Sequence, residues 1–180
     1  MDHSTGAMLP KFSFVLGGAG SGKSAFAEGL VLQTGAPKVY LATSEIYDDE
    51  MRAKVDAHIE LRGPSWRTIE APKDLRPALE NVRAEEVILL DCATMWLSNH
   101  LMAESDIDAE TETLMAALKA CLGRVVVVSN EVGMGIVPDN ALARRFRNLQ
   151  GQLNQRLAAE ADLAVFIVAG LPTVLKGELP

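Results

Sequence analysis

Short apolar runs alternate along the chain with longer segments in which apolar residues recur at helical spacing. Several of the runs are rich in valine and isoleucine without polar alternation, which is typical of strands covered on both faces. Strands are expected at Phe12–Leu16, Lys38–Ala42, Trp66–Glu70, Val87–Asp91, Arg124–Ser129 and Leu163–Val168. Helices are expected between them, at Ser24–Gln33, Asp49–Arg62, Asp74–Arg83, Thr111–Leu122 and Asn140–Ala161.

The alternation of strands and helices predicts the fold class. Consecutive parallel strands need right-handed crossovers, which place helices on both faces of a mostly parallel sheet. The chain of 180 residues fits one domain, and no repeat, linker or low-complexity stretch divides it. We therefore predict a three-layer α/β sandwich over residues 12–180, preceded by a flexible N-terminal extension of residues 1–11.

The segment GGAGSGKS, from Gly17 to Ser24, lies between the first expected strand and the first expected helix. It fits the Walker A pattern in both its residues and its context. Its glycines let backbone amides approach phosphate oxygens, and the helix beginning near Gly22 adds the positive end of its dipole. We expect Lys23 to neutralise the β- and γ-phosphates and the Ser24 hydroxyl to ligate Mg²⁺. The segment predicts a nucleotide triphosphate site and a P-loop NTPase-like fold.

A P-loop enzyme usually also has a carboxylate at the end of another strand, which holds Mg²⁺ directly or through water. Asp91 ends the apolar run Val87–Asp91, at the strand end where ligands gather in open α/β sheets. An alternative is that Asp91 caps a helix that starts near Thr94. Asp91 is therefore a candidate for the metal-binding acid, with helix capping left open.

The late part of the chain argues against a GTPase switch of the Ras type. Such a switch reads guanine with an Asn-Lys-x-Asp segment, whereas the segment Ser129–Val132 has no lysine or aspartate at those places. The loop over residues 129–140 is longer than the roughly two to six residues of most such connections, which favours a functional role. Four arginines of the next helix either grip phosphate or form a solvated face: Arg144, Arg145, Arg147 and Arg156.

The helix expected at Asp49–Arg62 has an apolar stripe formed by Met51, Val55 and Ile59, and His58 lies beside it. A neutral imidazole can attack an α-phosphate and leave again, which is the chemistry of a nucleotide carrier. Spacing alone also allows an ordinary, partly exposed helix residue. Of the other two histidines, His100 is expected to pack or cap at a helix end, and His3 belongs to the extension.

The composition narrows the partners. The formal net charge of −7 argues against broad binding to nucleic acid, which usually needs a basic face. Two cysteines, Cys92 and Cys121, imply no disulfide framework and agree with a reducing cytosol. The first eleven residues lack the apolar region of a signal peptide, and no run approaches the roughly 18 apolar residues of a membrane span. We expect a cytoplasmic protein without a membrane span.

Five stretches together resemble a known family: GGAGSGKS; YLATSEIYDDEMRAKVDAHIELR with WRTIEAP; LLDCATMWLSN; VSNEVGMGIVPDNALARRFRNLQGQLNQRLAAEAD; and AGLP. From about Phe12 to Lys176 the chain resembles the bifunctional adenosylcobinamide kinase/adenosylcobinamide-phosphate guanylyltransferases of cobalamin (vitamin B12) biosynthesis. The resemblance implies phosphorylation of adenosylcobinamide with ATP or GTP. It then implies transfer of GMP from GTP, through a histidine-GMP intermediate, to give adenosylcobinamide-GDP. It also implies a homotrimer.

The resemblance assigns roles to individual residues. It makes His58 the guanylylated histidine, which with Lys23 forms the expected catalytic pair. Mg²⁺ is expected at Ser24 and Asp91 from the P-loop pattern and the strand-end acid. The family's nucleotide contacts fall on Gly17, Gly18, Ala19, Gly20, Ser21, Gly22, Lys23, Ser24, Ser44, Glu45, Ile46, Leu61, Arg62, Gly63, Pro64, Glu70 and Asp91. Two residues depart from the family pattern, because Gly20 and Lys54 stand where arginine is usual.

Two other functions fit parts of the sequence. One is a monofunctional P-loop kinase for another small metabolite, in which His58 is structural. The other is a regulatory protein that binds nucleotide without turning it over. A covalent GMP label on the protein distinguishes the transferase from both.

Overall fold

The central sheet places its first strand beside the fifth and sixth strands rather than beside the second. A computed structural model of the chain describes residues 8–180, whose seven strands form one sheet in the order β3-β2-β4-β5-β1-β6-β7. β1 to β6 are parallel, and β7 is antiparallel to β6. The strands are β1 (Phe12–Gly17), β2 (Lys38–Ala42), β3 (Trp66–Glu70), β4 (Val87–Asp91), β5 (Arg124–Asn130), β6 (Leu163–Val168) and β7 (Leu171–Lys176).

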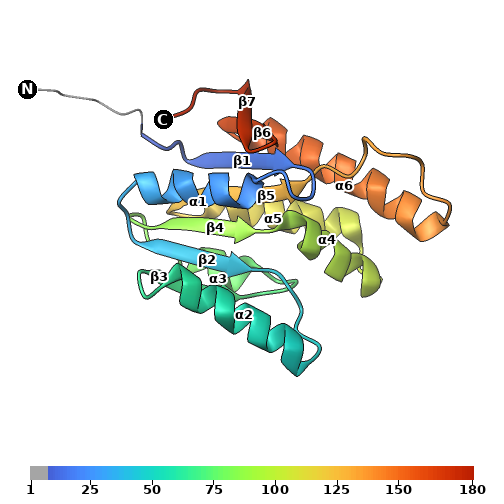
Figure 1. Cartoon of the computed structure of the whole chain (residues 1–180), viewed down its shortest axis with the longest axis horizontal. Helices are drawn as coiled ribbons and strands as arrows, with labels where there is room; N and C mark the ends of the chain where they lie inside the picture. The colour runs from blue at the N-terminus through green and yellow to red at the C-terminus, as the bar shows by residue number, and fades with distance from the viewer. Residues whose placement is uncertain (1–7) are drawn as a thin grey trace, which may run out of the picture.

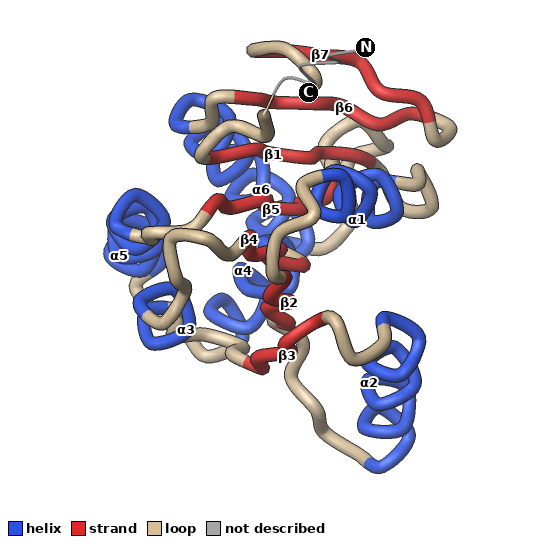
Figure 2. The backbone as a smooth tube through the Cα atoms, turned by 90° about the vertical axis from the view of Figure 1, so that its left-hand side faces the viewer, coloured by secondary structure: helices blue, strands red, loops and turns tan. Residues whose placement is uncertain are grey.

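Helices cover both faces of this sheet, as the alternation of elements predicts. They are α1 (Lys23–Gln33), α2 (Asp49–Arg62), α3 (Arg76–Glu80), α4 (Ala93–Met102), α5 (Ile107–Ala120) and α6 (Ala141–Glu160). Figure 2 shows α1 and α2 on one side of the sheet and α3 and α5 on the other. The predicted three-layer α/β sandwich with a mostly parallel sheet is confirmed.

The strands are apolar on both faces because each face has its own hydrophobic cluster. In β4, Ile88 and Leu90 join the cluster under α3 to α6, while Val87 and Leu89 join the cluster under α1. Successive side chains of a strand point to opposite faces, so an uninterrupted apolar run is what a doubly covered strand needs. The α1 cluster also includes Leu9, which is buried ahead of the first strand.

The first seven residues, with His3 and much of the expected N-terminal extension, lie outside the described residues. Residues 8–11 are described, and they are joined to the body of the protein. The Lys11 ammonium donates to the carbonyls of Leu122 (2.6 Å) and Gly123 (2.7 Å) at the start of β5.

Four elements differ from the sequence-based expectation. α4 was not among the expected helices, although a helix starting near Thr94 was considered as an alternative role for Asp91. β7 was not expected, because it has no uninterrupted apolar run and all six of its residues are exposed. α3 is shorter than the expected helix Asp74–Arg83, because the Arg83 amide bonds to the Glu86 carboxylate (2.8 Å) instead of continuing the helix. α5 begins earlier than expected, where Asp106 caps it by accepting from the Ala109 amide (3.1 Å).

The carboxyl ends of the parallel strands lie at the same edge of the sheet, on the right in Figure 1. Strand register pairs Gly17 with Asn130 and pairs Ala42 with both Asp91 and Glu70. The P-loop, Asp91 and Glu70 therefore emerge on one edge although they lie far apart in sequence. Ligands bind at this edge in open α/β sheets.

Candidate active site

The P-loop leaves β1 at Gly17 and enters α1 at Lys23. Gly22, the residue before the helix, has a φ of 90°, and no side chain caps the helix there. Apart from the Lys23 amide, which donates to the Ser21 hydroxyl at 3.3 Å, the first amides of α1 are available to an anion. Lys23 donates from Nζ to the Gly18 carbonyl (3.2 Å), so its charge lies within the loop, where it can neutralise phosphate.

The turn between β6 and β7 packs against the P-loop and is hydrogen-bonded to it. The Gly170 amide donates to the Ser21 carbonyl at 2.7 Å. A β-carbon added to Gly22 would lie 3.1 Å from the Gly170 α-carbon. This close approach favours glycine at position 22, whereas Gly170 is favoured by its φ of 75°, since a β-carbon there would meet nothing within 4 Å.

A cavity of about 310 Å³ opens beside the P-loop, between α1, α2 and the carboxyl ends of β2 and β4. Among its lining residues are these candidates from the sequence: Ser24, Ser44, Ile46, His58, Arg62, Glu70 and Asp91. Glu28, Tyr40, Ala42, Val55, Cys92 and Met95 complete the lining. The fold therefore brings the P-loop serine, the acid at the end of β4 and the candidate carrier histidine into one cavity.

Other candidates lie outside this cavity. Glu45 points elsewhere, since its carboxylate accepts from the Tyr47 hydroxyl and pairs with the Lys73 ammonium (3.5 Å). Leu61 is 84% exposed, Gly63 ends α2 with a φ of 78°, and Pro64 is exposed. The remaining P-loop residues, Gly17 to Lys23, are absent from the cavity lining and adjoin it through Ser24.

The carboxylate of Asp91 accepts a hydrogen bond from the Tyr40 hydroxyl, at 2.6 Å from Oδ2. Asp91 does not cap α4. The residue in that place is Cys92, whose Sγ accepts from the Met95 amide at 3.4 Å. The capping alternative is therefore wrong, and the Asp91 carboxylate faces the cavity.

Sequence reasoning missed Tyr40, which lies in the apolar run of β2 and was counted only as part of a strand. Its side chain is 9% exposed, and its hydroxyl reaches the site. Burial, and then the charge of Asp91, raises the pKa of this hydroxyl well above its ordinary value. The hydroxyl therefore stays a hydrogen-bond donor at neutral pH. The sequence did offer one indication of this role: Tyr40 lies two residues before the end of β2, where side chains can reach a site at the carboxyl edge of the sheet.

α2 presents His58 to the cavity together with Val55 and Arg62. The expected stripe faces inward only in part: Met51, Val55 and Ile59 are half-buried, and no residue of α2 is buried. Arginines join this helix to the sheet. Arg52 pairs with Glu70 at 2.8 Å, and the Arg62 guanidinium lies 3.5 Å from the centre of the Tyr40 ring.

The loop after β5 is held by arginines of α6. Arg147 donates to the Gly133 carbonyl (2.7 Å) and Arg144 to the Pro138 carbonyl (2.9 Å), while Arg156 pairs with Glu112 (2.6 Å). These three arginines therefore support the protein's own structure. The loop adjoins the P-loop, because the Glu131 amide donates to the Gly17 carbonyl at 3.0 Å.

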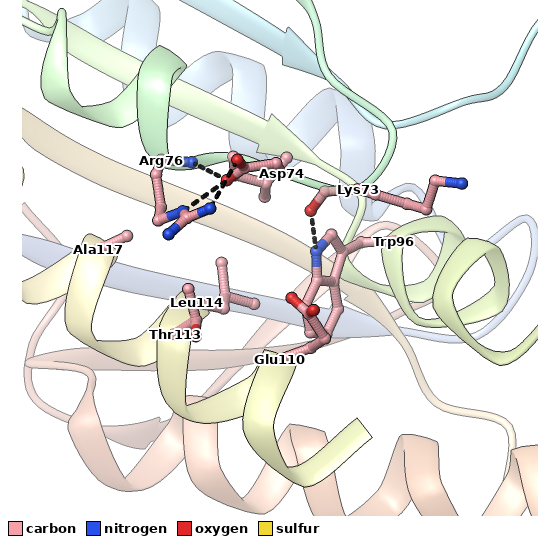
Figure 3. Close-up of a pocket in the computed structure, with 9 residues that line it drawn as sticks. Lys73, Asp74, Arg76, Trp96, Glu110, Thr113, Leu114 and Ala117 are labelled. Atoms are coloured by element: carbon pink, nitrogen blue, oxygen red, sulfur yellow. Dashed lines mark hydrogen bonds and ion pairs between the residues drawn. The ribbon is translucent and has the colours of Figure 1, made fainter. Parts of the chain in front are cut away.

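The other described histidine, His100, packs as expected. It is 3% exposed, its ring stacks edge-on against Trp96, and Nδ1 lies 3.0 Å from the Ser105 hydroxyl. Trp96 donates to the Lys73 carbonyl beside a small pocket that also contains Glu110 (Figure 3). This pocket has a volume of about 10 Å³, which is room for no more than a water molecule.

The Ser24 hydroxyl and the Asp91 carboxylate offer the oxygen ligands that Mg²⁺ prefers. Within residues 8–180, no group of three or more His, Cys, Asp or Glu side chains could hold a metal. Mg²⁺ is often held by one or two protein oxygens together with substrate phosphates, and these two residues fit that mode. In the same described range, no helix is both long and apolar enough to cross a bilayer.

Comparisons with known sequences point to one family. A profile of the family described as cobinamide kinase / cobinamide phosphate guanyltransferase matches residues 13–175. The bifunctional adenosylcobalamin biosynthesis protein CobU of Salmonella typhimurium is 43% identical over 179 residues, covering 90% of this chain and 98% of the relative. The bifunctional adenosylcobalamin biosynthesis protein CobP of Pseudomonas aeruginosa is 41% identical over 167 residues, covering 91% and 96%.

Comparison with solved structures concerns the fold alone. An ATPase from the type III secretion system of pathogenic bacteria matches with a TM-score of 0.55 and 12% sequence identity. The match covers 91% of this chain and 56% of that one. At this identity the match shows a shared α/β fold, and it says nothing about activity or substrate.

Proposed function

The chain belongs to the cobinamide kinase / cobinamide phosphate guanyltransferase family, and from that premise we propose that one cavity serves both of its reactions. The protein is a bifunctional enzyme of adenosylcobalamin biosynthesis, with kinase and guanylyltransferase activities. The observation that carries the proposal is that His58, Ser24 and Asp91 line the same cavity. A nucleotide held there meets both the P-loop and the candidate carrier.

In the proposed kinase reaction, the P-loop amides and Lys23 bind the triphosphate of ATP or GTP. The aminopropanol hydroxyl of adenosylcobinamide attacks the γ-phosphorus and loses its proton, and the bond to the β-phosphate oxygen breaks. The nucleoside diphosphate leaves. Lys23 stabilises charge on the phosphate oxygens, and the loop positions them for in-line attack.

In the proposed guanylyltransferase reaction, a ring nitrogen of His58 attacks the α-phosphorus of GTP. A phosphorus–nitrogen bond forms, the bond to the β-phosphate oxygen breaks, and pyrophosphate leaves against the P-loop amides and Lys23. The phosphate of adenosylcobinamide phosphate then attacks the same phosphorus and displaces the imidazole. The product is adenosylcobinamide-GDP, and His58 returns to its free form.

The proposed nucleotide site also includes Mg²⁺, with Ser24 and Asp91 as the protein oxygens that fit it. Mg²⁺ bound with a triphosphate neutralises charge on the phosphate oxygens. The protein contributes the Ser24 hydroxyl from the start of α1 and the Asp91 carboxylate from the end of β4.

We further propose that the protein is cytoplasmic and assembles as a homotrimer. Exposed apolar side chains on β7 and in the loop after β5, among them Leu171 (70% exposed) and Ile136 (97% exposed), support an assembly that covers them. Sedimentation equilibrium should then give three times the chain mass of 19.4 kDa. A monomer mass across the micromolar range would contradict the assembly.

The function is tested with GTP labelled at the α-phosphate. Wild-type protein should acquire an acid-labile label and lose it when adenosylcobinamide phosphate is added. His58→Ala should acquire no label but should still phosphorylate adenosylcobinamide, because that step does not use the imidazole. Glu60→Ala, which changes an exposed residue of the same helix, is the control and should label normally. Full labelling of His58→Ala would overturn His58 as the carrier.

A further inference from the structure

Tyr40 contacts two charged groups of the site at once. Its hydroxyl donates to Oδ2 of Asp91 at 2.6 Å, and the Arg62 guanidinium lies over its ring, 3.5 Å from the ring centre. Parallel register sets Ala42 beside Asp91, so Tyr40 lies on the neighbouring strand and on the same face as the carboxylate. One side chain therefore bridges the end of β4 and the end of α2.

The hydroxyl fixes the Asp91 carboxylate. Because Tyr40 is 9% exposed, its hydroxyl is largely withheld from water and remains with its carboxylate partner. A hydrogen bond to a charged group in a protected place is among the stronger ones. The bond occupies one carboxylate oxygen and restrains rotation of the group, which leaves the other oxygen for a ligand in the cavity.

The ring acts on α2. No residue of this helix is buried, and none of its residues belongs to either hydrophobic cluster. Arg52 pairs with Glu70 near the start of the helix, and Arg62 lies on Tyr40 at its end. The electron-rich face of an aromatic ring attracts a guanidinium, so this contact attaches the end of α2 to β2.

The Tyr40 ring has a fixed orientation of its own. It packs edge-on against Trp66 of β3, with ring centres 6.0 Å apart and an interplanar angle of 76°. The Lys38 ammonium, from the same strand as Tyr40, lies 5.9 Å from the Trp66 ring centre. Packing within the sheet thus fixes the Tyr40 side chain. Tyr40 in turn orients the Asp91 carboxylate and the Arg62 guanidinium through its contacts with them.

We propose that Tyr40 is a positioning residue, which orients Asp91 through its hydroxyl and the His58 helix through its ring. The inference rests on the proposed function for the roles of Asp91 and His58. It adds that the phosphate end of the site and the carrier helix are placed by one side chain. The effect of the hydroxyl on Asp91 and the effect of the ring on α2 can be separated. A phenylalanine at position 40 keeps the ring without the hydroxyl, and a leucine has neither.

The test compares Tyr40→Phe and Tyr40→Leu with the wild type in two measurements that need no turnover. The first is hydrogen exchange of the amides of α2. The second is GTP binding by calorimetry at a series of Mg²⁺ concentrations. Tyr40→Phe should leave α2 exchange unchanged but raise the Mg²⁺ concentration for half-maximal binding about tenfold, the scale of one charged hydrogen bond. Tyr40→Leu should do the same and also speed α2 exchange severalfold.

Three controls make the outcomes decisive. Exchange of α6 should match the wild type in both variants, which shows that the sheet is folded. Tyr47→Phe removes a hydroxyl from an exposed tyrosine that also donates to a carboxylate, and it should not change the Mg²⁺ dependence. In an Asp91→Asn background, Tyr40→Phe should cause no further change in the Mg²⁺ dependence of GTP binding.

An unchanged Mg²⁺ dependence in Tyr40→Phe would overturn the role of the hydroxyl, and unchanged α2 exchange in Tyr40→Leu would overturn the role of the ring. Neither measurement uses the covalent label. Loss of the His58 proposal would therefore leave the exchange result standing, and the two failures can be told apart.

Discussion

The amide of Gly170 donates to the carbonyl of Ser21 at 2.7 Å, which joins the turn before β7 to the P-loop. The two segments lie at opposite ends of the sequence. Their backbones meet at Gly22 and Gly170, where a β-carbon on Gly22 would lie 3.1 Å from the Gly170 α-carbon. The conformation of the phosphate-binding loop thus depends on a turn that carries no phosphate-binding group of its own.

Gly22→Ala should destabilise the protein and weaken nucleotide binding. The φ of 90° at this position is unfavourable for alanine, which predicts a loss of about 1 to 2 kcal/mol in the free energy of unfolding. Denaturant unfolding and calorimetry with GTP measure the two effects. Gly29→Ala is the matched control in the same helix, where nothing lies within 4 Å of the added β-carbon, and it should be neutral or stabilising.

Lys23→Ala should weaken GTP binding at least tenfold, which corresponds to about 1.4 kcal/mol. The ammonium lies within the P-loop, 3.2 Å from the Gly18 carbonyl, where it can turn to phosphate. Calorimetry measures the affinity, and unchanged affinity would rule out the proposed role. Lys119→Ala removes a largely exposed lysine that pairs with Glu160, and it should bind GTP as the wild type does.

Glu86→Gln should reduce the amount by which the free energy of unfolding falls between pH 7 and pH 3. Burial alone would raise the pKa of Glu86, but hydrogen bonds from the Arg83 amide and the Arg67 guanidinium outweigh it and lower the pKa below its ordinary value. A lowered folded-state pKa contributes stability at neutral pH, and this contribution is lost as pH falls through that pKa. The stability gap between wild type and variant should therefore be about 1 to 3 kcal/mol at pH 7 and shrink by pH 3.

Urea unfolding across pH 3 to 7 measures this gap. Glu85→Gln changes an exposed neighbour, and its acid profile should follow that of the wild type. A gap for Glu86→Gln that stays constant over the whole range would show that the Glu86 carboxylate titrates alike in the folded and unfolded chains.

Asn154→Ala should cost about 2 kcal/mol of unfolding free energy, because it leaves buried partners unsatisfied. Its amide oxygen accepts from the Ser129 hydroxyl (2.6 Å) and from Gln150 (2.9 Å), and its nitrogen donates to the Asn130 carbonyl (3.1 Å). Thermal unfolding measures the loss. Asn148→Ala, on the exposed side of the same helix, should change stability by no more than about 0.5 kcal/mol.

The strands of the core were predictable because their apolar runs are uninterrupted. β2 and β4 begin and end at the residues that the sequence indicated, since helices cover both of their faces. β7 was not predictable, because an exposed edge strand containing Pro172 has no burial pattern to reveal it. Strand order also could not be read from periodicity, which is the same for any arrangement of the strands.

The site was predictable where local sequence defines the chemistry. The P-loop is a contiguous motif, and Asp91 ends an apolar run, so both could be proposed from the sequence alone. The bond between Tyr40 and Asp91 was not predictable, because it depends on the register that sets Ala42 beside Asp91. The position of His58 beside the cavity rested on the family resemblance, since its spacing alone also fits an ordinary surface residue.

The cavity that Ser24, His58 and Asp91 share has a volume of about 310 Å³, near the lower end of ligand pockets, which span roughly 300 to 1,000 Å³. A site of this size holds one nucleotide at a time. Under the proposed use, the nucleoside diphosphate left by the first reaction has to depart before GTP is loaded for the second. Each enzyme molecule then alternates between its two reactions.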